Sequence, residues 1–261
     1  MRNIRIDIEY DGTNYFGFQR QKKGTTVQSA LEETFTELCQ EPITIFGAGR
    51  TDSGVHALGQ VCHFKTSSGL AIERLFKGSN KLLPKDIAIL SLREMPERFH
   101  ARHSAKKRAY AYFVLNRPSP SALFRNFLTW APYALDDQGM TEACEFLQGH
   151  HDFSSFAGAK SSQPRTSITV NKVKCFRGTG SLNVPFSTLG EDCITFYIEA
   201  QSFLYNMVRI LMGTLLEIGQ KKRPSSDMKK LLGHPDRKKA GPTAPSKGLF
   251  LVSVEYPQEF Q

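Results

Sequence analysis

Hydrophobic and charged residues alternate at the start of the chain, where Ile4, Ile6 and Ile8 are separated by charged side chains. This period of two predicts a strand with one buried face. A turn at residues 10–14 follows, and then a capping-box signature formed by Thr25 and Gln28. Apolar residues recur at helical spacing from there up to Pro42, which predicts a helix. The pattern then predicts strands at 43–46 and 59–66, a helix at 71–83 and a strand at 86–92.

The rest of the chain repeats a similar order of elements with longer insertions. Strands are predicted at 105–116, 166–176, 192–201 and 251–256, and helices at 141–147 and 204–218. The order indicates an α+β fold of two similar halves with one mostly antiparallel sheet. We place the halves at residues 1–104 and 105–261.

The chain of 261 residues is basic, with 34 Lys and Arg against 25 Asp and Glu, and the distribution of charge is uneven. Residues 98–135 hold seven bases and no acid, residues 153–190 hold five bases and no acid, and residues 221–247 hold nine bases and two acids. One such stretch is compatible with an ordinary solvated face. Three in one chain favour a nucleic-acid partner.

Other features of the composition exclude several classes of protein. No uncharged apolar run approaches the ~18 residues of a membrane span, and the first residues alternate like a strand rather than a signal peptide. The five cysteines are scattered and contain no Cys-x-x-Cys motif. We therefore expect a reduced cytoplasmic protein without a membrane anchor, a disulfide framework or a zinc cluster.

The loop at residues 47–57 is the strongest candidate for chemistry. Its glycines allow tight turns and close approach to a ligand, and Asp52 lies between Arg50 and His56. A cationic neighbour keeps a carboxylate ionised and available as nucleophile or base. The alternative is a tight turn in which Asp52 only caps backbone N–H groups.

Signatures of other catalytic and metal sites are weak. The loop has no Gly-Lys-Ser/Thr for phosphate, no alternating oxygen ligands for calcium and no Gly-x-Ser-x-Gly elbow around Ser53. Adjacent His150 and His151 point apart in regular structure, so a metal site there is not favoured. We expect His63 to lie on a half-buried strand, and His100 to lie in a loop.

Residues 49–57, with the sequence G-R-T-D-S-G-V-H-A, resemble the signature loop of the tRNA pseudouridine synthase A (TruA) family. Further blocks resemble the family in the same order, at residues 10–21, 26–32, 99–112, 203–213 and 244–256. The similarity therefore covers almost the whole chain. Two positions depart from the usual pattern: Ser53 replaces alanine and Phe18 replaces tryptophan.

The resemblance implies an enzyme that isomerises uridine to pseudouridine in the anticodon stem-loop of tRNA, at positions 38, 39 and 40. It implies two α/β-sandwich-like subdomains that form a continuous, mostly antiparallel sheet with an active-site cleft between them. It also implies a homodimer that binds tRNA, with no cofactor and no metal.

The resemblance also assigns roles to individual residues. Asp52 matches the catalytic aspartate, acting at C1′ or C6 of the uridine or through a glycal intermediate. Tyr110 matches an active-site tyrosine that stacks on the base, and Arg209 matches the basic partner of the aspartate. An arginine in an apolar helix needs a partner when it is buried, and Gly213, one turn later, leaves room for another segment. The remaining expected substrate contacts are Arg50, Thr51, His56, Gln19, Arg20, Phe203 and Leu204.

Two other functions fit part of the pattern. A non-catalytic protein that binds structured RNA would also use basic stretches and aromatics, but it gives no reason for Asp52 in a basic setting. A metal-dependent nuclease would need clustered acids, and Asp52 has no carboxylate near it in sequence.

Overall fold

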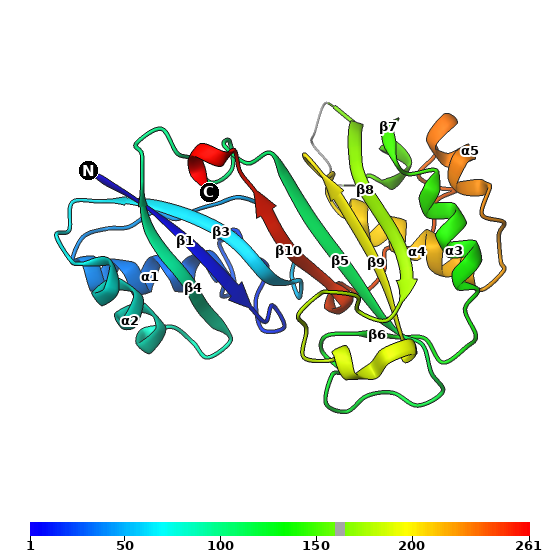
Figure 1. Cartoon of the computed structure of the whole chain (residues 1–261), viewed down its shortest axis with the longest axis horizontal. Helices are drawn as coiled ribbons and strands as arrows, with labels where there is room; N and C mark the ends of the chain where they lie inside the picture. Colours follow the sequence, from blue (N-terminus) through cyan, green and yellow to red (C-terminus); the bar gives the residue numbers. More distant parts are fainter. Residues whose placement is uncertain (160–164) are drawn as a thin grey trace. The chain divides into compact units, whose positions relative to one another are not determined.

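The computed structural model describes residues 1–159 and 165–261 (Figure 1). Its contacts divide the chain into two compact units. Unit 1 comprises Met1–Arg108 and Phe250–Gln261, and unit 2 comprises Ala109–Leu249. Unit 1 thus extends four residues past the predicted division at residue 104, and it includes the C-terminal segment.

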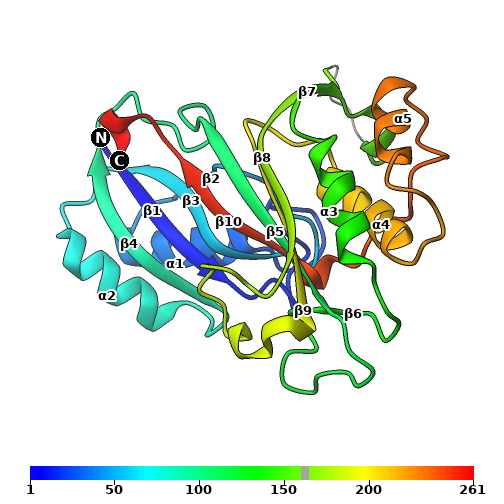
Figure 2. The same cartoon turned by 45° about the vertical axis from the view of Figure 1, so that its right-hand side comes forward.

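Unit 1 is a sheet with two helices against one face (Figures 1 and 2). Its strand order is β4-β1-β3-β10, with β2 paired to β3. The pairs of β1 with β3 and β4 are antiparallel, and β10 runs parallel to β3. The elements are β1 (Arg2–Tyr10), α1 (Val27–Cys39), β2 (Phe46–Gly47), β3 (His56–Thr66), α2 (Ile72–Leu82), β4 (Ile87–Met95) and β10 (Leu249–Glu255).

Unit 2 has its own run of strands, in the order β5-β9-β8-β7, with β6 paired to β5. The β7–β8 and β8–β9 pairs are antiparallel, and helix α3 packs on β8 and α4. The elements are β5 (Lys107–Leu115), β6 (Thr129–Trp130), α3 (Asp137–Glu145), β7 (Gly149–Asp152), β8 (Ser167–Arg177), β9 (Cys193–Ala200), α4 (Met207–Gly219) and α5 (Asp227–Gly233). The predicted α+β class with mostly antiparallel pairing is confirmed.

The hydrophobic period explains the core of unit 1. Ile4, Ile6 and Ile8 are fully buried on one face of β1. The alternate residues Arg5 and Asp7 lie on the opposite face, as a period of two requires.

Among the described residues, every helix is too short or too polar to cross a membrane.

Three local predictions were wrong in detail. The strand expected at 43–46 is only Phe46–Gly47, because Ile45 N donates to Glu32 Oε1 of α1 instead of to a strand. The capping box is formed by Thr26 and Ser29, one residue later than expected. Helix α4 begins at Met207 rather than at residue 204, because Asn206 before it adopts a left-handed conformation with a φ of 61°.

Two further differences concern α3 and β7. Helix α3 covers Asp137–Glu145, four residues earlier than predicted, because the Asp136 side chain accepts a hydrogen bond from Gly139 N and caps it there. His150 and His151 form part of the short strand β7, which the sequence pattern did not predict. Their ring nitrogens lie 2.9 Å from Thr169 Oγ1 and 2.9 Å from Gln148 O, respectively.

Candidate active site

The loop that carries Asp52 connects β2 to β3, and side chains from outside the loop fix its first residues. Gln60 binds both sides of Gly49: its Nε2 donates to Gly49 O at 2.8 Å, and its Oε1 accepts from Gly49 N at 3.3 Å. The Nη2 of Arg108 donates to Ala48 O at 2.9 Å. The loop therefore leaves the sheet from a fixed position.

The N-terminal segment at residues 10–21 holds the tip of the same loop. Phe18 N donates to Thr51 O at 3.0 Å, and Gly54 N donates to Tyr15 O at 3.3 Å. The hydroxyl of Ser53 also donates to Tyr15 O, at 3.2 Å. The serine that departs from the family pattern therefore adds a contact between the two segments.

A buried group of polar side chains supports the base of the loop. Tyr10 and Thr51 share a hydrogen bond of 2.7 Å between their hydroxyls. Gly12 N donates to His56 Nδ1 at 3.0 Å, and Asp11 Oδ1 lies 3.1 Å from that nitrogen. Burial alone would raise the pKa of Asp11, but its contact with His56 and the hydrogen bonds donated by Thr13 lower it to about 2. His56 is fully buried, so its ring serves here to hold the turn at Gly12.

A chain of hydrogen bonds connects Arg50 to helix α1. Arg50 Nε donates to Gln19 Oε1 at 3.1 Å, and Gln19 Nε2 donates to Gln28 Oε1 at 2.6 Å. Gln28 Nε2 donates in turn to Glu32 Oε1 at 2.9 Å. The other carboxylate oxygen of Glu32 accepts from Arg20 Nη1 at 2.8 Å. Because Gln28 and Glu32 are buried, they give the exposed Arg50 a fixed anchor.

Asp52 is partly exposed at the tip of this fixed loop. Val55 N donates to the backbone carbonyl of Asp52 at 3.1 Å and closes a tight turn, and Gly54 completes the turn with a φ of 74°. A carboxylate held at a defined, accessible position is the arrangement that nucleophilic or base catalysis needs.

The other predicted site residues come from unit 2. Tyr110 lies in β5, where every residue from Ala109 to Leu115 is buried. The ring of Phe203 packs edge-on against Tyr110, with the ring centroids 4.9 Å apart. Leu204, in the turn before α4, is buried. Tyr112, by contrast, is tied inside unit 2, because its hydroxyl donates to Pro245 O at 2.7 Å.

Arg209 is held in place at the start of α4. Its Nε donates to Ala244 O at 2.8 Å, and its Nη1 donates to Asn206 Oδ1 at 2.9 Å. The segment that carries Ala244 approaches α4 at Gly213, as predicted. A Cβ added to Gly213 would lie 1.7 Å from Pro242 O, so only glycine admits this approach.

The predicted residues thus fall into two groups. The first group lies in or beside the Asp52 loop in unit 1 and comprises Gln19, Arg20, Arg50, Thr51 and His56. The second group lies in unit 2 and comprises Tyr110, Phe203, Leu204 and Arg209. Sequence reasoning gave no supporting role to Gln60, Arg108 or Glu32. The sequence did contain a signal for Glu32. Its carboxylate follows Leu31 and lies next to the apolar stripe of the helix, where a charged side chain needs a partner.

Comparisons with known proteins identify the family of the chain. A family model described as "tRNA pseudouridine synthase" matches residues 7–104 and 143–257. The chain is 42% identical over 256 residues to tRNA pseudouridine synthase A of Caldicellulosiruptor bescii, which covers 98% of this chain and 100% of the relative. It is 41% identical over 256 residues to the protein of the same name from Acetivibrio thermocellus, with the same coverage. Identity to tRNA pseudouridine synthase A 2 of Clostridium tetani is 38% over 257 residues, or 98% of this chain and 99% of the relative.

These matches define an RNA-modifying isomerase. The chain belongs to the tRNA pseudouridine synthase A family, whose members convert uridine to pseudouridine in tRNA.

Proposed function

We propose that the protein forms pseudouridine at positions 38, 39 and 40 in the anticodon stem-loop of tRNA, with Asp52 as the catalytic residue. The observation that carries the proposal is the fixing of the Asp52 loop from two sides, by the N-terminal segment through Thr51 and by Gln60 through Gly49. A loop that only closed a turn would not need hydrogen bonds from both the N-terminal segment and Gln60.

The reaction exchanges one bond for another on the same nucleoside. The bond between N1 of uracil and C1′ of the ribose breaks, and a bond between C5 and C1′ forms. The proton on C5 is lost and N1 gains one, so no oxidant and no energy source is required. Asp52 acts as nucleophile at C1′ or C6, or assists departure of uracil through a glycal intermediate.

The residues of unit 2 complete this site in the proposal. Tyr110 stacks on the target base and assists removal of the C5 proton. Arg209 pairs with Asp52 and keeps the carboxylate ionised. The support for this role is the resemblance to the family; within unit 2, Arg209 is held by Asn206 and Ala244.

Substrate contacts in the proposal come from the groups around Asp52. A base in a stem must leave its stack to be reached, at a cost of a few kcal/mol, and Arg50 props the nucleotide in that position. Gln19, Arg20, Phe203 and Leu204 contact the RNA nearby. Thr51 and His56 form buried hydrogen bonds, which favour a positioning role for these two residues. Basic stretches such as residues 98–135 contact phosphates, and the protein works as a cytoplasmic homodimer.

Mapping of pseudouridine tests the proposed sites directly. Transcripts of a tRNA that carries uridine at 38, 39 and 40 should gain pseudouridine at these positions, and replacing each uridine with cytidine should remove one signal at a time. Modification only elsewhere in the tRNA would refute the assignment of position. Binding without any modification would support the alternative, a non-catalytic protein that binds structured RNA.

A further inference from the structure

Two arginines stand directly opposite each other on neighbouring strands of unit 1, away from the Asp52 loop. Arg5 of β1 pairs with Arg93 of β4 in the antiparallel register. Like charges at such a position destabilise a sheet. The arrangement therefore calls for an explanation beyond stability.

One carboxylate serves both guanidinium groups. Asp7 Oδ1 accepts from Arg5 Nε at 2.8 Å, and Asp7 Oδ2 lies 3.3 Å from Arg93 Nη2. Ser91 Oγ also donates to Asp7 Oδ2, at 2.7 Å. Two positive charges thus share one negative charge, and the pair keeps a net positive charge.

Arg5 is rigid and Arg93 has donor capacity to spare. Arg5 Nη1 donates to Phe260 O at 2.7 Å, and its guanidinium lies 4.8 Å from the centroid of the Tyr256 ring. The Nε of Arg93 is buried and has no hydrogen-bond partner in this structure. The Arg93 side chain as a whole is 40% exposed, so its outer N–H groups are open to an external acceptor.

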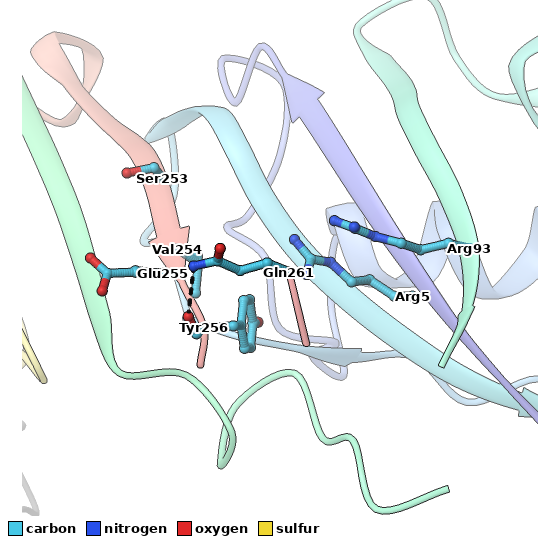
Figure 3. A pocket seen from close by; sticks show the side chains of 7 residues that line it. All are labelled: Arg5, Arg93, Ser253, Val254, Glu255, Tyr256 and Gln261. Atoms are coloured by element: carbon cyan, nitrogen blue, oxygen red, sulfur yellow. Dashed lines mark hydrogen bonds between the residues drawn. The ribbon is translucent and has the colours of Figure 1, made fainter. Parts of the chain in front are cut away.

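Both side chains point into an open pocket of about 360 Å³ (Figure 3). Ser253, Tyr256 and Gln261 line the pocket with them. Glu255 also belongs to the lining, but its carboxylate points away from the arginines in Figure 3 and lies 3.4 Å from Lys107 Nζ. The volume lies within the range of small-molecule pockets, about 300–1,000 Å³.

We propose that this pocket binds a phosphate group through Arg93 and Arg5. Guanidinium groups bind phosphate with paired, charge-assisted hydrogen bonds. The group comes either from the RNA backbone or from a small phosphorylated molecule. Arg5 lies five positions along β1 from Tyr10, the partner of Thr51, or about 17 Å at 3.4 Å per residue, so the pocket is a separate site from Asp52.

Inorganic phosphate tests the pocket without tRNA, so the result does not depend on the proposed catalytic function. The melting temperature is measured with phosphate or chloride at equal ionic strength, for the wild type, Arg93→Gln, Arg93→Lys and the control Arg74→Gln. Arg74 is exposed on α2, against the other face of the sheet. Phosphate should stabilise the wild type and Arg74→Gln equally, Arg93→Lys less, and Arg93→Gln least, by only the general effect of phosphate on any folded protein.

The stability of Arg93→Gln in chloride separates binding from a purely structural role. A binding arginine opposite Arg5 predicts no loss of stability on its removal, whereas a structural ion pair predicts a lower melting temperature. The proposal is overturned if phosphate stabilises the wild type and Arg93→Gln alike, or stabilises neither, or if Arg93→Gln melts clearly lower in chloride.

The salt dependence of tRNA binding then identifies the source of the phosphate. If the occupant is an RNA phosphate, Arg93→Gln should change the slope of the logarithm of the binding constant against the logarithm of the salt concentration. The slope should become shallower by about 0.7–0.9. If the slope is unchanged while the stabilisation by inorganic phosphate is lost, the occupant is a small phosphorylated molecule. Each result supports the pocket.

Discussion

Gly17 lies directly against Thr51: a Cβ added to Gly17 would come within 2.6 Å of the Thr51 carbonyl oxygen. Gly17 also has a φ of +87°, a conformation that other residues rarely adopt. The next residue, Phe18, donates its N–H to that same oxygen at 3.0 Å. The N-terminal segment and the Asp52 loop are therefore one fitted structure, although more than thirty positions separate them in the sequence.

Gly17→Ala should impair catalysis more than folding. Positive φ at alanine costs about 1–3 kcal/mol, and the added methyl group pushes the Thr51–Asp52 backbone away. A small displacement of a catalytic group can cost about 100-fold in rate. The measurements are the free energy of unfolding and kcat for Gly17→Ala and for Gly69→Ala, whose added Cβ would meet nothing within 4 Å. Equal kcat values in the two variants would contradict a fitted loop.

Gln28→Leu tests the hydrogen-bond chain behind Arg50. The variant leaves Glu32 and Gln19 without their shared partner, and an unsatisfied buried group costs about 1–3 kcal/mol. Arg50 loses its fixed anchor, so kcat/KM should fall by about tenfold, which corresponds to about 1.4 kcal/mol. Gln138→Leu, on the exposed face of α3, is the control. Stability lost without any change in kcat/KM would show that the chain of bonds serves folding alone.

Arg209→Leu tests the proposed pairing with Asp52. Loss of the cation should raise the pKa of the carboxylate, so activity should fall near neutral pH and recover in part as pH rises. Arg209→Lys should restore activity only in part, because lysine lacks the planar fork. The measurement is the pH–rate profile of both variants and the wild type. A leucine variant with the wild-type rate and profile would exclude the pairing.

Stability should fall as pH drops from about 6.5 to about 4 because of His63. Burial, with the nearby His100 as a further cause, lowers the pKa of His63 to about 4, and its Nδ1 accepts a hydrogen bond from Ala101 N at 3.2 Å. The unfolded chain therefore takes up this proton at a higher pH than the folded chain does. The free energy of unfolding, measured with urea between pH 7 and pH 4, should depend less on pH in His63→Gln than in the control His150→Gln. Equal slopes would contradict this account.

The sequence pattern predicted most elements because their signals are local. The alternation at Ile4, Ile6 and Ile8 reports one buried face, and the apolar sequence of α4 reports a helix that is buried on most sides. The end of the predicted strand at 43–46 was not predictable in this way, because Ile45 takes its backbone partner from a side chain of α1. Neither was the place of Phe250–Gln261 in unit 1, which depends on pairing with β3.

The same distinction holds for the candidate site. The glycines and charges of the Asp52 loop made it a candidate for chemistry from the sequence alone, with a tight turn as the alternative. The supports of the loop come from distant residues, since Gln60 and Arg108 act through hydrogen bonds to its backbone. Backbone contacts leave no pattern in the partner's sequence, so only the structure reveals them.

Turnover by Asp52→Asn is the most direct test of the central claim. The amide is nearly isosteric but cannot act as an anionic nucleophile or base. Wild type and variant are incubated with tRNA labelled with tritium at C5 of uridine, and release of tritium is measured alongside tRNA binding. We predict release by the wild type, and less than about a hundredth of that rate in the variant, with tRNA binding retained. Release at a comparable rate by both proteins would contradict the assignment of Asp52 as the catalytic residue.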